Sequence, residues 1–250
     1  MPTVEHLKNA PITEAVIDFR VKLPSDFKIT EFSSLKDDLR NKYPTVKERQ
    51  TSESKFGIKE GKPFTSFPSK MELRGYQFIS SDDKNIAQFR MDGFTFNRLK
   101  PYTNWNSVMA EAKSLWALYV EKSNPEFVTR IATRYINHLN IPLPITGLSD
   151  YLVSPPKIPH NLDESLLVTS FLNKIVIRNP KTNILVNITQ ALDKSLDENH
   201  VIIILDIDAF VKKSYKVDDE DMWRTFDQLR KMKNEIFFKS ITNKTVSLFQ

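Results

Sequence analysis

The sequence contains no cysteine and only 5 glycines among its 250 residues. Without cysteine there is no disulfide framework, thiolate zinc site, iron–sulfur cluster or cysteine nucleophile. The few glycines form no GxGxxG or GxxxxGK(S/T) phosphate-binding loop, and neither HExxH nor GxSxG occurs. The histidines are dispersed, at His6, His138, His160 and His200. These absences weigh against the common enzyme classes, and we expect no cofactor.

Long hydrophobic segments are also missing. The longest uncharged apolar run is Val201–Leu205, which is far too short to span a membrane. The first fifteen residues are polar and lack the apolar stretch of a secretory signal. We therefore expect a cytoplasmic protein with no membrane association.

The charge is moderately basic, with a formal net charge of +5 and an isoelectric point near 9.2. Acidic and basic residues are interleaved along the chain, and no block of five or six like charges occurs. A nucleic-acid-binding protein usually shows a more concentrated basic stripe. This pattern favours a mixed, solvated surface, and nucleic-acid binding remains an alternative.

Hydrophobic periodicity predicts an α+β fold in which antiparallel strands carry helices on one face. The segment Glu14–Leu23 alternates strictly between apolar and polar residues, as a half-buried strand does. Helices are expected to begin near Thr30 and near Asn104, and a third long helix is expected to begin within Val217–Asp221, which supplies a hydrophobic residue and an acidic first turn. Residues 45–70 are expected to form a short strand and then a long surface loop. The further strands are expected at Met71–Ser80, Asn85–Leu99, Phe127–Ile141, Ser165–Arg178, Thr182–Leu192 and Val201–Lys212.

Two halves of the sequence follow a similar order of strand, hairpin, strand and helix. Thr13–Leu23 resembles Thr129–Leu139, which begins 116 residues later, and the Asp–small–Phe motifs at Asp92 and Asp208 have the same offset. This offset is consistent with an internal duplication, although two matches could also arise by coincidence. We expect α+β halves at residues 1–124 and 125–250, packed as one compact unit.

Charged residues occupy the polar positions of the repeated strands, and we expect them to share the face of the sheet that carries no helices. Opposite charges on neighbouring strands commonly pair, and that interpretation is favoured here. A polar cleft that binds a charged ligand is the functional alternative. Its candidate ligand-binding residues are Arg20, Arg90, Arg130, Arg134 and His138, and its candidate metal ligands are Asp206 and Asp208, with Asp92 as a further carboxylate.

The C-terminal segment Lys233–Gln250 continues the last helix and then changes character. Thr242–Thr245 is expected to form a turn, because Asn and Thr side chains favour turns. Val246, Leu248 and Phe249 are too apolar to remain in water. We expect this tail to dock, either on the core of the protein or in a groove of a partner.

Both ends of the chain resemble a sporadically distributed family of uncharacterised bacterial proteins. The resemblance is carried by NAPITEAVIDFRV at residues 9–21, KNEIFFKSIT at 233–242 and the Leu-Phe pair at 248–249. It implies no activity and no catalytic residues. The patchy distribution of such a family implies mobile islands, phage defence or toxin–antitoxin loci.

Three hypotheses follow from the sequence. The leading hypothesis is a non-catalytic cytoplasmic protein for binding or assembly, which engages a protein partner or a second copy through a sheet face or hydrophobic interface. The first alternative is Mg²⁺- or Mn²⁺-dependent phosphoryl or nucleotidyl chemistry at Asp206 and Asp208. The second is nucleic-acid binding, which would show a strong dependence on salt.

Overall fold

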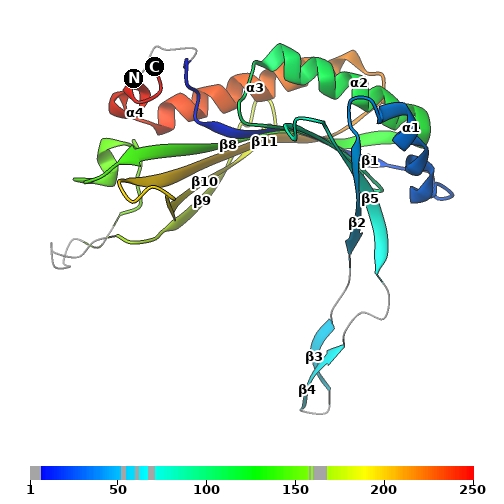
Figure 1. Cartoon of the computed structure of the whole chain (residues 1–250), viewed down its shortest axis with the longest axis horizontal. Coiled ribbons are helices and arrows are strands. Elements are labelled where there is room, and N and C mark those ends of the chain that lie inside the picture. The colour runs from blue at the N-terminus through cyan, green and yellow to red at the C-terminus, as the bar shows by residue number, and fades with distance from the viewer. Residues whose placement is uncertain (1–6, 52–54, 60–61, 67–70, 158, 160–167) are drawn as a thin grey trace.

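One antiparallel sheet of nine strands dominates the computed structural model, which describes residues 7–51, 55–59, 62–66, 71–157, 159 and 168–250 (Figure 1). The strand order is β2–β5–β6–β7–β1–β8–β11–β10–β9. The strands are β1 (Ile12–Lys22), β2 (Thr45–Thr51), β5 (Glu72–Ile79), β6 (Asn85–Arg90), β7 (Gly93–Leu99), β8 (Phe127–Pro142), β9 (Leu172–Arg178), β10 (Leu185–Lys194) and β11 (His200–Tyr215). This confirms the predicted α+β class.

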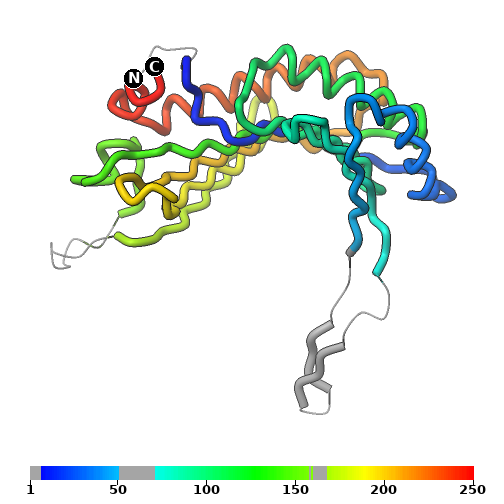
Figure 2. Tube along the Cα trace, in the orientation of Figure 1, coloured from blue at the N-terminus to red at the C-terminus, as the bar shows by residue number. Residues whose placement is uncertain are grey.

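Two long helices, α2 (Trp105–Ser123) and α3 (Glu220–Ser240), lie side by side across one face of the curved sheet (Figures 1 and 2). Each begins where the sequence provides a cap: the side chain of Asn104 accepts a hydrogen bond from the Ser107 backbone N–H, and Asp219 accepts one from Asp221. Shorter helices are α1 (Leu35–Leu39), α4 (Asn243–Ser247) and two 3-10 turns, Ile29–Ser34 and Leu148–Asp150. No described helix is long and apolar enough to cross a membrane.

Aromatic rings fill the space between the sheet and the two long helices. Phe19 of β1 stacks on Trp116 of α2 with 4.2 Å between ring centroids, and it lies 5.0 Å from the ring of Phe226 of α3. All three side chains are buried. Offset and tilted aromatic pairs contribute about 0.5–1.5 kcal/mol each beyond the area that they bury. The central strand is therefore the common support of both helices.

The predicted single strand Asn85–Leu99 is wrong, because the backbone turns at Met91 and Asp92 and forms the hairpin β6–β7. Gly93 permits this turn: its φ is +149°, and a Cβ atom there would lie 1.9 Å from the carbonyl oxygen of Phe19. Asp92 thus lies in a turn, whereas Asp208 lies within β11. The two Asp–small–Phe motifs are not equivalent, and internal duplication stays a prediction.

Three other predictions need correction. The segment predicted as a long surface loop contains a separate two-stranded sheet, β3 (Lys55–Lys59) and β4 (Lys62–Ser66). The strand predicted from Ser165 begins at Leu172, and Ser165 lies outside the described residues. Thr242 does not form a turn with its successors, because its side chain accepts a hydrogen bond from the Thr245 backbone and caps α4.

The C-terminal tail packs against the chain's own core. Val246 and Phe249 are buried, whereas Leu248 between them is 40% exposed. The Thr245 hydroxyl donates to the Tyr151 carbonyl at 2.7 Å, and the Phe249 carbonyl accepts from the Asn9 backbone at 3.0 Å. Of the two expected docking surfaces, the structure shows the intramolecular one.

We predict that Phe249→Ala lowers the free energy of unfolding by about 2–4 kcal/mol, because it removes a buried ring and leaves a cavity. Leu248→Ala is the matched control and should cost less than about 1 kcal/mol, since its side chain is partly solvated. Urea denaturation of both variants measures the difference. Equal and small losses would show that the tail does not pack as described.

Candidate functional site: the charged face of the sheet

The face of the sheet opposite the long helices carries the charged residues predicted from the sequence. We call eight of them, from strands β1, β6, β8 and β11 and the β6–β7 turn, the charged face. They are Asp18, Arg20, Arg90, Asp92, Arg130, Arg134, Asp206 and Asp208. A hollow of about 300 Å³ opens on this face and is lined by six of the eight, together with residues that include Glu14 and Arg49.

Asp18 on β1 is the centre of the ion-pair network. Its carboxylate accepts hydrogen bonds from Arg130 at 2.8 Å and from Arg90 at 3.1 Å, and from the Thr95 hydroxyl at 2.7 Å. Arg20 donates a further bond at 3.2 Å. Four donors from strands β1, β6, β7 and β8 therefore converge on one buried carboxylate.

The carboxylates of the two candidate metal ligands on β11 already accept hydrogen bonds from arginine or asparagine side chains. Arg134 makes a two-pronged contact with Asp206, at 2.8 Å from Nε and 2.6 Å from Nη2. Asp208 accepts from the Asn187 amide at 3.1 Å and lies 3.3 Å from Arg130. Cross-strand charge pairing, the interpretation favoured from the sequence, is what the geometry shows.

The electrostatics differ between the two buried carboxylates. Burial by itself would raise the pKa of Asp18, but Arg20, the Thr95 hydroxyl, Arg90 and Arg130 hold it below its usual range. Burial raises the pKa of Asp208, because its cation contacts are weaker and longer. Asp18 is thus the stabilised anion of this face.

The remaining predicted residues lie at the margin of the network. Asp92 contacts Arg20 and Arg90 from the β6–β7 turn, and its side chain is largely exposed. His138 lies on the same face of β8 as Arg134 but does not line the hollow, and no described residue hydrogen-bonds with its ring. Burial lowers the pKa of His138, so the neutral imidazole is favoured at pH 7.

Within the described part of the chain, no group of three His, Asp or Glu side chains is placed to hold a metal ion. The predicted convergence of Asp92 with Asp206 and Asp208 is absent from that part of the structure. A metal at Asp206 and Asp208 would first have to displace Arg134 and Arg130. The arrangement serves best to hold β1, β6, β8 and β11 together, while Arg20 and Arg134 remain accessible to a polar partner.

A different feature, not singled out in the sequence, is the free edge of the sheet at β9. Its aliphatic side chains are exposed on both faces: Leu172 by 77%, Val176 by 56%, Ile175 by 47% and Ile177 by 40%. Among the described residues β9 pairs only with β10, so its outer backbone groups meet no other described strand. The sequence carried an indication of these exposed side chains in the segment LNKIVIR, which is apolar at both odd and even positions. That β9 is an edge strand came only from the structure.

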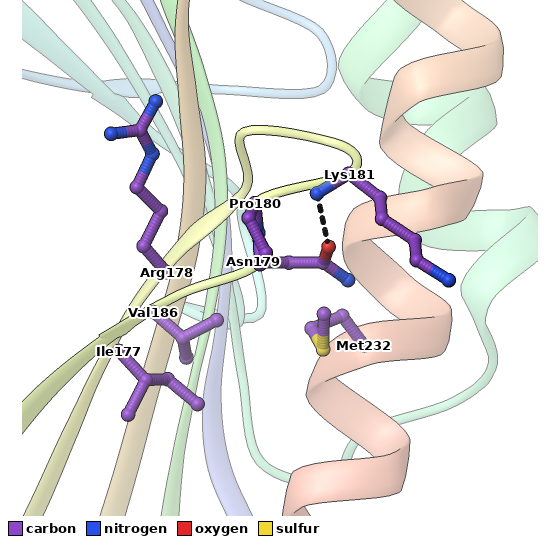
Figure 3. A pocket seen from close by; sticks show the side chains of 7 residues that line it. All are labelled: Ile177, Arg178, Asn179, Pro180, Lys181, Val186 and Met232. Carbon is purple, nitrogen blue, oxygen red and sulfur yellow. Dashed lines mark hydrogen bonds between the residues drawn. The ribbon is translucent and has the colours of Figure 1, made fainter.

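A shallow hollow of about 440 Å³ adjoins this edge on the helix side (Figure 3). Ile177 and Val186 line it from the hairpin, and Met232 faces them from α3. The turn between the strands is held by the Asn179 side chain, which accepts a bond from the Lys181 backbone at 2.9 Å. The edge therefore combines backbone groups that meet no other described strand, exposed aliphatic side chains and a neighbouring recess.

We predict that Asp18→Asn lowers the free energy of unfolding by about 3–5 kcal/mol at pH 7, because three guanidinium groups lose their shared anion. Asp92→Asn is the control and should cost at most about 1 kcal/mol, as expected for an exposed pair. Guanidinium denaturation measures both. Similar losses in the two variants would contradict a central role for Asp18.

The same carboxylate predicts an acid-dependent loss of stability. Because its pKa is lowered by folding, the stabilisation is present above the unfolded value of about 3.9 and is lost as the pH falls through the lower folded value. Unfolding experiments between about pH 5 and pH 2 should show a steeper decline for the native protein than for Asp18→Asn. If stability falls with pH equally in the two proteins, the pKa of Asp18 is not lowered by folding.

The metal alternative is tested by calorimetric titration with Mn²⁺. We expect no saturable binding at about 1 mM, because arginines already neutralise both carboxylates. Saturable binding that disappears in Asp208→Asn would instead establish a metal site at β11.

The comparisons with known proteins add no function to this geometry. No protein-family model matches the chain, and none of the curated proteins matches it. A functional assignment therefore depends on the exposed and charged surfaces described above.

Proposed function

We propose that the protein is a non-catalytic assembly protein whose free sheet edge, β9, pairs with β9 of a second copy. The observation that carries this proposal is the exposure of aliphatic side chains on both faces of an edge strand. Proteins usually protect a free edge with short strands, inward charges or a covering segment, since an exposed apolar edge pairs readily with another strand. The charged face, by contrast, satisfies most of its own charges.

A second copy fits this edge because the strand is self-complementary. In a two-fold antiparallel pair, residues on the same face must lie opposite each other. Centring the pair on Ile175 overlaps all seven residues and places Lys174 opposite Val176, and Leu172 opposite Arg178. Centring the pair on Val176 instead would place Lys174 opposite Arg178 of the second copy. Centring it on Lys174 would place the two copies of Lys174 opposite each other, and like charges in such positions destabilise a sheet.

The recess beside β9 supports the same arrangement. In this register Ile175 of the second copy lies diagonal to Ile177, which lines the recess on the helix side. Interfaces that bury less than about 1,200 Å² are typical of weak, reversible complexes, and a pair of seven-residue strands is expected to fall in this class. We therefore expect a dimer with a dissociation constant in the micromolar range, which joins two sheets and leaves the two charged faces on the same side of the joined sheet, separated by β10 and β9 of each copy.

The register predicts a charge-swap experiment at the two-fold axis. Ile175→Glu and Ile175→Lys should each be monomeric, because like charges would meet at the axis. An equimolar mixture of the two should restore a dimer, since opposite charges then meet. Sedimentation velocity at about 1–100 μM protein spans the expected dissociation range.

The matched control is Leu196→Glu, which changes a fully exposed leucine away from this edge and should dimerise like the native protein. The exposure of Ile175 keeps the core intact in the charged variants, which circular dichroism verifies. A native protein that stays monomeric at about 100 μM, or a dimer that persists in Ile175→Glu, would overturn the proposal.

A further inference from the structure

A cavity of about 120 Å³ lies between the N-terminal arm, β8 and α3, away from both the charged face and β9. Its wall combines apolar residues, among them Pro11, Trp105 and Phe237, with polar ones that include two cations of α3. These are Lys233 and Arg230, which are three residues apart and so share one side of the helix.

Lys233 is an unusual member of this wall because it is only 7% exposed. Its ammonium lies 3.3 Å from the ring centroid of Tyr135 on β8, and it makes no ion pair or hydrogen bond with any described residue. A tyrosine ring offers a cation partial compensation, but it accepts few of the three N–H donors. Burying a charge without a counter-ion is costly, so a lysine in this position needs an anion or must lose its proton.

Arg230 is the second cation of the cavity and lies at its exposed rim. Its guanidinium lies over the Trp105 ring at 5.4 Å and has no carboxylate partner among the described residues. The side chains of Tyr102 and Asn234 also line the cavity, and the Tyr102 hydroxyl lies 3.1 Å from that of Tyr135. Two cations of α3, a phenol hydroxyl and an amide therefore line one cavity, and these are donor types that bind oxyanions.

We propose that this cavity binds a small oxyanion, either phosphate or a short carboxylate, with the Lys233 ammonium as the inner contact and Arg230 as the outer one. Apolar walls strengthen the electrostatic contact by excluding water. A volume of about 120 Å³ suits one small group. This site is separate from β9, so its test is independent of the proposed dimer.

Proton uptake should accompany binding. Burial and the nearby Arg230 guanidinium lower the pKa of Lys233 to about 7, so part of the population is neutral when the site is empty. The other titratable groups around the ammonium are Tyr102 and Tyr135, and burial raises the pKa of both phenols, which keeps them neutral. A bound anion favours the ammonium form, and the affinity for acetate, whose charge is constant in this range, should therefore fall as the pH rises above about 7.

Isothermal titration with inorganic phosphate and, separately, with acetate at constant ionic strength tests the site. Lys233→Met should weaken binding at least about tenfold, and Arg230→Gln should weaken it less, because its charge is more solvated. Lys231→Gln removes the same charge from the same helix outside the cavity and should change affinity less than about twofold. Titrations with acetate, which is fully ionised near pH 7.5, in two buffers of different ionisation enthalpy should show proton uptake in the native protein and none in Lys233→Met.

Lys233→Met should fold, because methionine replaces an unpaired buried charge with an apolar chain of similar length. Arg230→Gln changes an exposed residue and provides a second variant if the first is unstable. Binding of phosphate, acetate or both with these losses supports the proposal, and the preferred anion identifies the ligand class. No binding of either anion by the native protein at about 10 mM, or equal binding by Lys233→Met and the native protein, would overturn it.

Discussion

The buried carboxylate of Asp18 is the constraint on which the polar half of this structure depends. It lies on a central strand, where burial alone would make an ionised group costly. Arg130 and Arg90 reach it from strands on either side, so the ion pairs also tie β6 and β8 to β1. The next residue, Phe19, faces the other way and supports both long helices. Two adjacent residues therefore organise the two faces of the sheet.

In this organisation, charged residues that pair with one another lie apart from the surfaces proposed to bind a partner or ligand. On the charged face, arginines and aspartates neutralise one another, so few charged groups there are available to bind a ligand. The opposite situation holds at β9, where aliphatic side chains and outer backbone groups lack described partners. It also holds at Lys233, where a buried cation lacks a described anion. Groups without internal partners point more directly to binding than charged residues that are already paired.

The proposed dimer and the proposed anion site depend on different kinds of interaction. Edge pairing supplies backbone hydrogen bonds and apolar contact over a modest area, which suits reversible assembly. The cavity beside Lys233 would stabilise one charge in an apolar enclosure, which suits recognition of a small ligand. Because α3 contributes Met232 to the recess by β9 and Lys233 to the cavity, one helix borders both surfaces.

The sequence by itself determined the local structure: alternation defined β1, Asn104 marked the start of α2, and apolar spacing identified the buried faces of the long helices. It also indicated that charges would gather on the helix-free face. Only the tertiary structure decided that Arg134 occupies Asp206, that β9 is an edge, and that Lys233 is buried without a described counter-ion. Periodicity reports which residues share a face, but strand order and helix packing decide which distant side chains meet.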